Sequence, residues 1–220
     1  MGSMIDFARP DGGSTRGYLA TAGADRPSMV VIQEWWGLND QICGVADRFA
    51  RAGYNALAPD LYEGRVTQEP DEANHMMSGL DFPGATNQDI RGAAQHLQAI
   101  GSKVGVMGFC MGGALTIAAA VHVPEFAVGV CFYGIPPQEF ANPANVAMPL
   151  QGHFANQDDW CTPAAVNELE ATLTAAEANV EIYRYDAAHG FFNETSEAAY
   201  HAASANQAWQ RMSDYLSSNL

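Results

Sequence analysis

Short apolar runs alternate with helical patterns along most of this chain, and that alternation constrains the fold more than any other feature of the sequence. The first helix expected between two runs covers 40–51, with Asn39 or Asp40 as its N-cap and Gly53 just beyond a basic last turn. Parallel strands joined by crossover helices give this order of elements. The sequence therefore predicts an α/β fold with a mostly parallel central sheet and helices on both faces. The expected strands are 29–33, 55–58, 103–107, 128–133, 148–153 and 180–185.

The other segments are expected to be helices, apart from one irregular excursion. Residues 62–83 have no clean period and are rich in turn formers and acids, so we expect them to cross over the top of the sheet. The next helix is expected to begin with Thr86 and Asp89 as a capping box and to stop at Gly101. Further helices are indicated by the all-apolar run 114–121, by the cap Thr162-Pro163, and by the apolar stripe Ala205, Trp209, Met212 and Leu216.

Charge and composition exclude several classes of partner. The chain has 25 acidic and 10 basic residues, a net charge of −15, so it lacks the clustered Lys and Arg that bind nucleic acid. No apolar run is long enough to span a membrane, and the N-terminus shows neither the basic nor the apolar region of a signal peptide. The four cysteines form no C-x-x-C pair and have no metal-ligand spacing, which favours reduced thiols in the cytoplasm and no metal site. Because no repeat or linker interrupts the chain, we expect a single domain over residues 1–220.

The segment Gly108-Phe109-Cys110-Met111-Gly112-Gly113 lies between an expected strand and the all-apolar helix. It has the pattern of the G-x-S-x-G nucleophile elbow, with cysteine in place of serine. The turn places Cys110 at a helix N-terminus, where the helix dipole favours thiolate over thiol. A phosphate-binding loop is the alternative, but the helix that follows lacks the Lys-Ser/Thr of a nucleotide loop. The sequence therefore predicts Cys110 as a nucleophile.

A cysteine nucleophile needs a base, and the base needs an acid that orients it. His189 follows the last expected strand directly, which is where the base lies in folds with this elbow. The acid belongs on the loop after the 148–153 strand, where either Asp158 or Asp159 could serve, and spacing alone does not choose between them. The remaining histidines fit the base less well because they lie in expected helices, in the excursion or at a strand end: His75, His96, His122, His153 and His201.

Four further motifs accompany the cysteine elbow: Gln33-Glu34-Trp35-Trp36-Gly37, Ala58-Pro59-Asp60-Leu61-Tyr62, Gly152-His153-Phe154 and His189-Gly190-Phe191-Phe192. Together these motifs resemble the dienelactone hydrolase family in order and in spacing, from about Met29 to the C-terminus. The resemblance implies an α/β-hydrolase fold and a Cys-His-Asp triad that cleaves an ester or lactone without a metal or an organic cofactor. Matching Gly152-His153-Phe154 onto the family pattern places the family's aspartate on Asp158.

The resemblance also implies roles for groups around the nucleophile. It gives Glu34 the task of keeping the resting thiol protonated until substrate displaces it, whereas the residues alone suggest only a carboxylate at a strand end. Backbone N–H groups of Met111 and, by resemblance, Trp35 would hold the oxyanion. Six aromatic residues could line a pocket, namely Trp35, Trp36, Tyr133, Trp160, Phe191 and Phe192, and of these we expect Trp36 and Phe191 to contact substrate.

The chain departs from the family at the positions that would bind the charged group of the substrate. Dienelactone hydrolases hold the free carboxylate of the lactone with arginines, and the position of one of them is Asn193 here. The other falls near Pro70, yet 66–89 contains no Arg or Lys, and Arg65 is the nearest candidate for substrate binding. The expected small-molecule substrate is therefore a neutral or less acidic ester or lactone, whose identity the sequence leaves open along with the oligomeric state.

Three other functions compete with this prediction. A general carboxylesterase or thioesterase would use the same three residues. A non-catalytic member of the family would bind small molecules through a triad too distorted for hydrogen bonding. A thiol-redox protein would need a resolving cysteine near Cys110, and no neighbour in the sequence supplies one.

Overall fold

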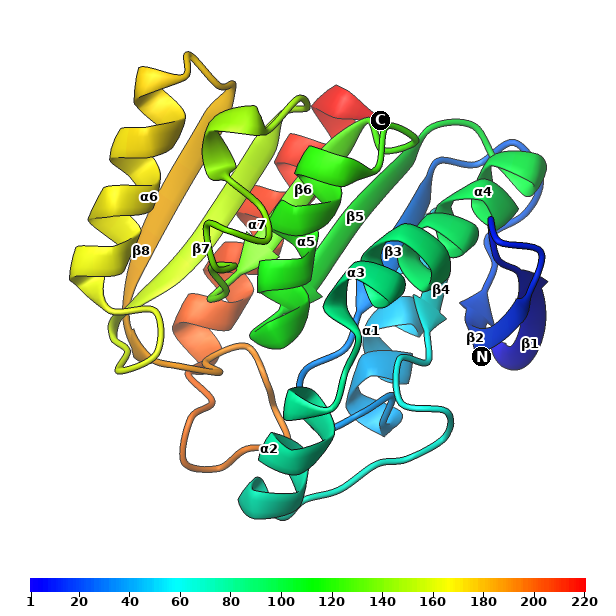
Figure 1. Cartoon of the computed structure of the whole chain (residues 1–220), viewed down its shortest axis with the longest axis horizontal. Coiled ribbons are helices and arrows are strands. Elements are labelled where there is room, and N and C mark those ends of the chain that lie inside the picture. Colours follow the sequence, from blue (N-terminus) through cyan, green and yellow to red (C-terminus); the bar gives the residue numbers. More distant parts are fainter.

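The computed structural model describes residues 1–220 and places eight strands in one sheet (Figure 1). The strands are β1 Ser3–Ala8, β2 Ser14–Ala20, β3 Ser28–Ile32, β4 Asn55–Pro59, β5 Val104–Phe109, β6 Val128–Phe132, β7 Leu150–Gln157 and β8 Val180–Ala188. Their order across the sheet is β1-β2-β4-β3-β5-β6-β7-β8. Strand β2 pairs antiparallel with both β1 and β4, and every other pair is parallel. The predicted mostly parallel sheet is therefore confirmed.

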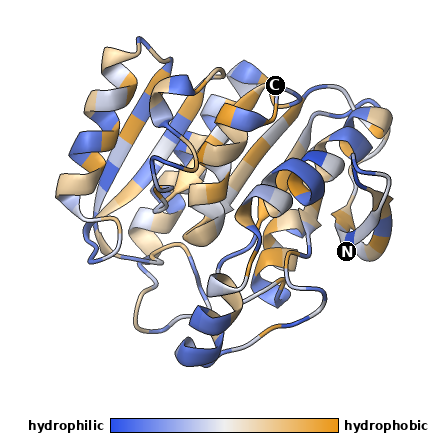
Figure 2. Ribbon diagram, viewed as in Figure 1, coloured by the Kyte–Doolittle hydropathy of each residue, from blue (hydrophilic) through white to orange (hydrophobic).

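Helices cover both faces of this sheet, as the alternation of patterns predicts. The α-helices are α1 Asp40–Arg51, α2 Pro70–Ser78, α3 Phe82–Gly84, α4 Arg91–Ile100, α5 Met111–His122, α6 Pro163–Ala175 and α7 Ala202–Asn219. Helices α1 and α7 lie on one face, and α4, α5 and α6 lie on the other (Figure 1). Apolar residues concentrate on the strands and on α5, which is buried along most of its length (Figure 2). No helix of the chain combines the length and the apolar character needed to cross a membrane.

Two elements at the margins of the fold differ from the sequence expectation. The hairpin of β1 and β2 was not predicted, because β1 lies at the sheet edge and buries only Phe7, so it lacks a continuous apolar run. The excursion over 62–83 contains α2, which begins at Pro70 and buries only Ala73 and Met76. So thin an apolar stripe gives too little periodicity for a helix to be recognised.

The predicted capping box at Thr86 and Asp89 is wrong, because both residues lie inside a helical run. That run begins at α3, where the Asp81 carboxylate accepts a hydrogen bond from the backbone N–H of Gly84 at 3.1 Å. It continues through the π-helical segment Ala85–Ile90 into α4, so the N-cap Asp81 lies five residues before Thr86 (86 − 81). A carboxylate at the N-cap satisfies the free N–H groups of the first turn, which is why Asp81 marks the start.

His153 is the most deeply buried histidine, and it is held inside β7 by hydrogen bonds on both ring nitrogens. Nδ1 lies 2.7 Å from the hydroxyl of Tyr185, and Nε2 lies 2.9 Å from Oε1 of Gln151. Its ring stacks on Phe132, with 4.5 Å between the centroids. Burial, and secondarily the charge of Arg211, lowers the pKa of His153 from 6.5 to about 3. The ring is therefore neutral in the folded protein at neutral pH.

This neutral histidine should make folding stability depend on pH. The unfolded chain takes up a proton at this residue as the pH falls below 6.5, whereas the folded chain takes it up only near 3. As the pH falls from 6.5 to about 3, this group alone should therefore lower the free energy of unfolding by about 1.4 kcal/mol per pH unit. Urea unfolding of the wild type and of His153→Gln, compared over the same pH range, measures the effect as a difference in slope. Parallel profiles for the two proteins would contradict the assignment.

Candidate active site

The four side chains predicted to carry the chemistry lie at one edge of the sheet. Glu34 follows β3, Cys110 follows β5, Asp158 follows β7 and His189 follows β8. These strands run parallel, so their carboxyl ends meet at the same edge, where sites of α/β proteins form. The structure thus brings together residues that are separated by up to 155 positions in the chain (189 − 34).

The turn at Cys110 is sharp, and its backbone is strained. Cys110 has φ of 53° and ψ of −115°, in the left-handed region that non-glycine residues rarely adopt. Two hydrogen bonds fix it there: its N–H donates to the Phe132 carbonyl, and its own carbonyl accepts from Ala114, each at 3.0 Å. A Cβ added at Gly112 would lie 2.5 Å from the Gln33 carbonyl oxygen, so that position has to be glycine. The local sequence therefore dictates a turn that lifts the cysteine out of the sheet edge.

His189 is hydrogen-bonded to Asp158, one of the two aspartates that the sequence left open. Its Nδ1 lies 2.8 Å from Oδ2 of Asp158, and the other carboxylate oxygen accepts from the backbone N–H groups of Trp160 and Cys161. Asp158 is buried, whereas Asp159 is exposed and makes no hydrogen bond through its side chain. The Nε2 atom of His189 is buried and has no hydrogen-bond partner within the protein. A base with one nitrogen anchored and the other free has the orientation required for proton transfer.

Burial and mutual contact set the protonation of these groups. Burial raises the pKa of the Cys110 thiol, while His189 and the backbone N–H of Met111 oppose that rise. Burial alone would lower the pKa of His189, but its contacts with Asp158 and Cys110 outweigh burial and raise that pKa to about 10. Burial also works against ionisation of Asp158, yet the hydrogen bonds that it accepts hold its pKa below the usual value. Cys110 and His189 therefore titrate as a coupled pair beside a charged aspartate.

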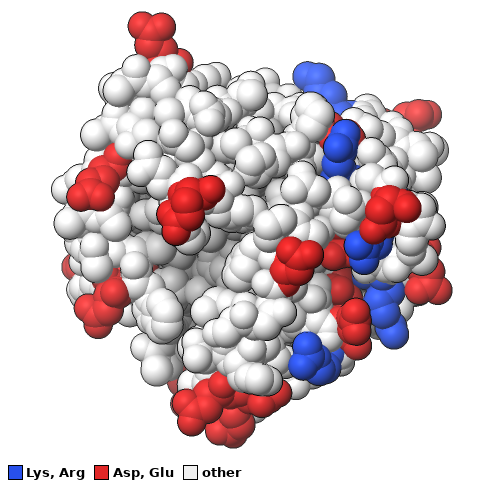
Figure 3. All heavy atoms as spheres, viewed as in Figure 1, with Lys and Arg blue, Asp and Glu red and all other residues white.

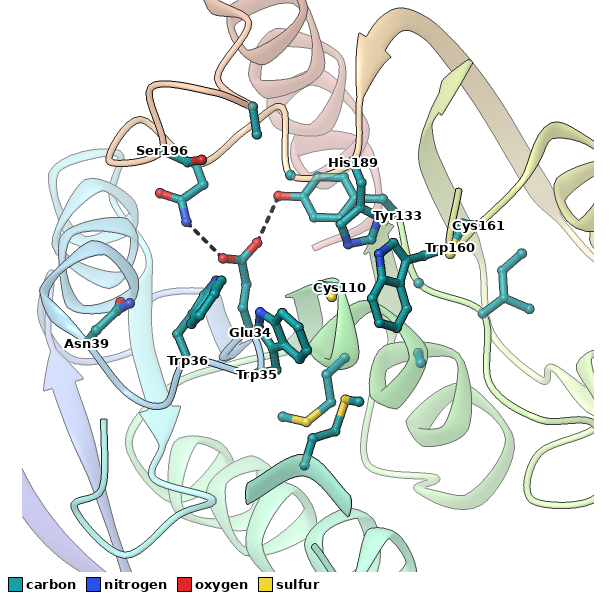
Figure 4. A pocket seen from close by; sticks show the side chains of 18 of the residues that line it. Glu34, Trp35, Trp36, Asn39, Cys110, Tyr133, Trp160, Cys161, His189 and Ser196 are labelled. Atoms are coloured by element: carbon teal, nitrogen blue, oxygen red, sulfur yellow. Dashed lines mark hydrogen bonds between the residues drawn. The ribbon is translucent and has the colours of Figure 1, made fainter. Parts of the chain in front are cut away.

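Glu34 is buried among neutral partners rather than paired with a cation. Its carboxylate accepts hydrogen bonds from Nδ2 of Asn193 at 2.9 Å and from the hydroxyl of Tyr133 at 3.3 Å, both marked by dashed lines in Figure 4. Asn193 is in turn held by Thr195, whose hydroxyl donates to Oδ1 at 2.7 Å. Burial raises the pKa of Glu34, although these hydrogen bonds and the nearby His189 oppose the rise. Glu34 therefore holds a proton more readily than an exposed glutamate does.

A cavity of about 650 Å³ opens beside Cys110 and His189. Three tryptophans form one part of its wall: the ring centroids of Trp35 and Trp36 are 5.0 Å apart, and those of Trp35 and Trp160 are 5.6 Å apart, both edge to face. Figure 4 shows Trp160 beside His189 and Trp36 beside Glu34, with Cys110 between the two sides. Such a volume suits a small organic molecule, and the site has the concave, mostly apolar form typical of ligand pockets.

Some of the residues expected to contact substrate line the cavity, and others do not. Trp36 lines the cavity, but Phe191 does not, because it is fully buried in the apolar core between the sheet and α7. Arg65 also lies outside the lining; it is exposed, and its Nε donates to the carbonyl of Tyr62. Tyr133 and Trp160 do line the cavity, although their sequence positions did not separate them from core residues. The two residues expected to donate backbone N–H groups to the oxyanion, Met111 and Trp35, both line the cavity.

The relationship of this chain to known proteins agrees with the geometry of the site. A model of the dienelactone hydrolase family matches residues 15–220. The chain belongs to the dienelactone hydrolase family. Among the relatives of this family member, Protein usf of Aquifex pyrophilus is 31% identical over 222 residues, which cover 95% of each chain. A protein of Aquifex aeolicus that is provisionally named a carboxymethylenebutenolidase is 28% identical over 221 residues, covering 96% of this chain and 95% of its own.

Solved structures identify the fold of this dienelactone hydrolase family member. A Klebsiella pneumoniae protein, provisionally named a dienelactone hydrolase, superposes with a TM-score of 0.80 at 26% identity. The match covers 96% of this chain and 97% of that one. The predicted α/β-hydrolase fold is therefore confirmed, and the chain is a member of a hydrolase family.

Proposed function

We propose that this protein hydrolyses a carboxylic ester or lactone through a Cys110-His189-Asp158 triad. One observation carries the proposal: His189 is anchored to Asp158 through Nδ1, its buried Nε2 has no hydrogen-bond partner, and His189 and Cys110 line the same cavity. A hydrogen bond of 2.8 Å also argues against a non-catalytic member with a distorted triad. A thiol-redox role finds little support, because burial and then Asp158 raise the pKa of Cys161, the other cysteine of the cavity.

The first half of the reaction would form a thioester. His189 accepts the proton of the Cys110 thiol on Nε2, and the raised pKa of the imidazole keeps the proton there. The thiolate attacks the carbonyl carbon, and the backbone N–H groups of Met111 and Trp35 stabilise the oxyanion. When the tetrahedral intermediate collapses, the bond to the alkoxide breaks and the alkoxide takes the proton from Nε2. The acyl group then remains on the sulfur.

The second half would return the enzyme to its resting state. His189, now neutral, removes a proton from water as the water oxygen attacks the thioester carbonyl. Collapse releases the carboxylic acid and expels the Cys110 thiolate, which takes back the proton held on Nε2 of His189. Glu34 would act before this cycle: burial and then the charge of Glu34 raise the pKa of the Cys110 thiol, which favours the protonated thiol until substrate binds.

The thioester gives a direct test of the proposed function. Rapid acid quenching during turnover of a 4-nitrophenyl ester should leave the acyl group on the protein, as an intact mass increased by one acyl unit. Peptide mapping should place that acyl group on Cys110 and on none of Cys43, Cys131 and Cys161. Turnover with the acyl group on another residue, or no turnover of any ester or lactone, would overturn the proposal.

A further inference from the structure

The cavity beside Cys110 contains no group with a fixed positive charge. None of the 23 residues that line it is Lys or Arg. Its only carboxylate is Glu34, and its only group that can become cationic is His189, which the proposed chemistry already occupies. A substrate carboxylate entering here would meet no side chain able to form the charge-assisted, bidentate contact that proteins use for such groups.

The polar groups of the lining offer little to replace a cation. Nδ2 of Asn193 is already committed to Glu34, and the Thr195 hydroxyl is committed to Asn193. The amides of Asn39 and Gln68 remain as donors, but neither carries a charge. Other parts of the wall are apolar, formed by side chains such as Met77, Phe82 and Ile135. A carboxylate that enters the cavity would therefore exchange water for amides, hydroxyls and hydrocarbon. Moving a charged group out of water in this way costs free energy.

The distribution of charge over the whole molecule acts in the same direction. The net charge of −15 repels anions at long range. The Lys and Arg side chains visible in Figure 3 lie in the right half of that face, on the side of α4 and of the hairpin β1–β2 in Figure 1. None of the ten Lys and Arg residues of the chain lines the cavity.

We infer that the substrate of this site is an uncharged ester or lactone with an apolar, flat group that rests on the tryptophans. The inference rests on the proposed function, since it names the class of ester on which Cys110 acts. A cationic group is not favoured, because the tryptophan rings contact one another edge to face at 5.0 and 5.6 Å instead of standing apart around a charge. Burial also favours the uncharged form of Glu34.

The test compares three 4-nitrophenyl benzoates that differ only in a para substituent: CH₂–COOCH₃, CH₂–COO⁻ or CH₂–N(CH₃)₃⁺. Each kcat/KM is divided by the rate constant for hydroxide-catalysed hydrolysis of the same ester, which removes electronic differences. We expect the neutral ester to exceed both charged ones by at least about tenfold, the order expected for one unpaired buried polar group. A smaller ratio, or a preference for either charged ester, would overturn the inference. The ratio against the anion should persist in about 0.5 M salt, where the Debye length is only about 4 Å.

A variant that supplies the missing cation provides a second readout. Gln68 lines the cavity, is exposed and makes no side-chain hydrogen bond, so Gln68→Lys should not disturb the fold. The new ammonium group should raise kcat/KM of the carboxylate ester, relative to that of the neutral ester, by about threefold, which is the size of effect that an exposed ion pair gives. Gln207→Lys, on an exposed position of α7, changes the net charge equally and should leave the ratio unaltered. Equal effects of the two variants, or none from Gln68→Lys, would also overturn the inference.

Binding without chemistry separates failure of the inference from failure of the proposed function. The matching 4-nitroanilides should resist hydrolysis, and their nitro group should quench the fluorescence of the tryptophans in the cavity wall. The neutral anilide should bind at least about tenfold more tightly than the carboxylate. If no ester is hydrolysed, the proposed function fails, while this binding ratio still supports or overturns the preference for uncharged ligands.

Discussion

Replacing Cys110 with alanine should lower kcat for ester hydrolysis by at least about 10⁴-fold, because no other group can then form the thioester. Binding should survive, since the cavity and its aromatic wall remain. Cys110→Ser should be nearly as inactive, because the serine hydroxyl is a far weaker acid than a thiol and His189 is set to hold the proton of a thiol. Steady-state kinetics, with anilide binding measured by fluorescence, checks both expectations.

The other three cysteines are matched controls for this result. Cys43 lies on α1, while Cys131 and Cys161 are buried, and burial is the largest cause that raises the pKa of each of these thiols. Their alanine variants should retain most of the activity. Cys161→Ala removes a thiol from the cavity wall, so any effect of this variant should be on KM. Activity close to that of the wild type in Cys110→Ala would mean that another nucleophile carries the reaction.

Asp158→Asn should reduce kcat by about 10³- to 10⁴-fold, because the amide no longer stabilises the imidazolium or selects its tautomer. The same change removes the contact that does most to raise the pKa of His189, so the rising limb of the pH–rate profile should move to lower pH. Asp159→Asn is the control: that side chain is exposed and makes no hydrogen bond, so activity should change less than about twofold. A silent Asp158→Asn with a damaging Asp159→Asn would show that the wrong carboxylate has been assigned to His189.

Much of the fold could be predicted because its central strands are buried on both faces. All five residues of β3 and all five of β4 are buried, and such strands appear in the sequence as short apolar runs. The prediction failed where burial is partial. Strand β1 buries one apolar side chain and helix α2 buries two, and neither leaves a periodic pattern.

The residues of the candidate site could likewise be predicted from the sequence only in part. The position of Cys110 followed from local sequence, since a strand, a glycine-rich turn and an apolar helix must produce an elbow. The choice between Asp158 and Asp159 depended on resemblance, because the distance to His189 is set by the pairing of β7 with β8. Whether an aromatic residue faces the cavity or the core depends on tertiary packing, which is why Phe191 was expected in the cavity and Trp160 was not.

The pairing of β8 at the sheet edge has a consequence for how this protein can lose its activity. His189 is the first residue after β8, which is partly exposed along most of its length and pairs only with β7. The proposed base is thus mounted on the margin of the scaffold, while the proposed nucleophile belongs to its centre. Fraying of this single strand would silence the proposed site while most of the sheet remained intact, so catalytic output would report on this margin of the molecule rather than on its core.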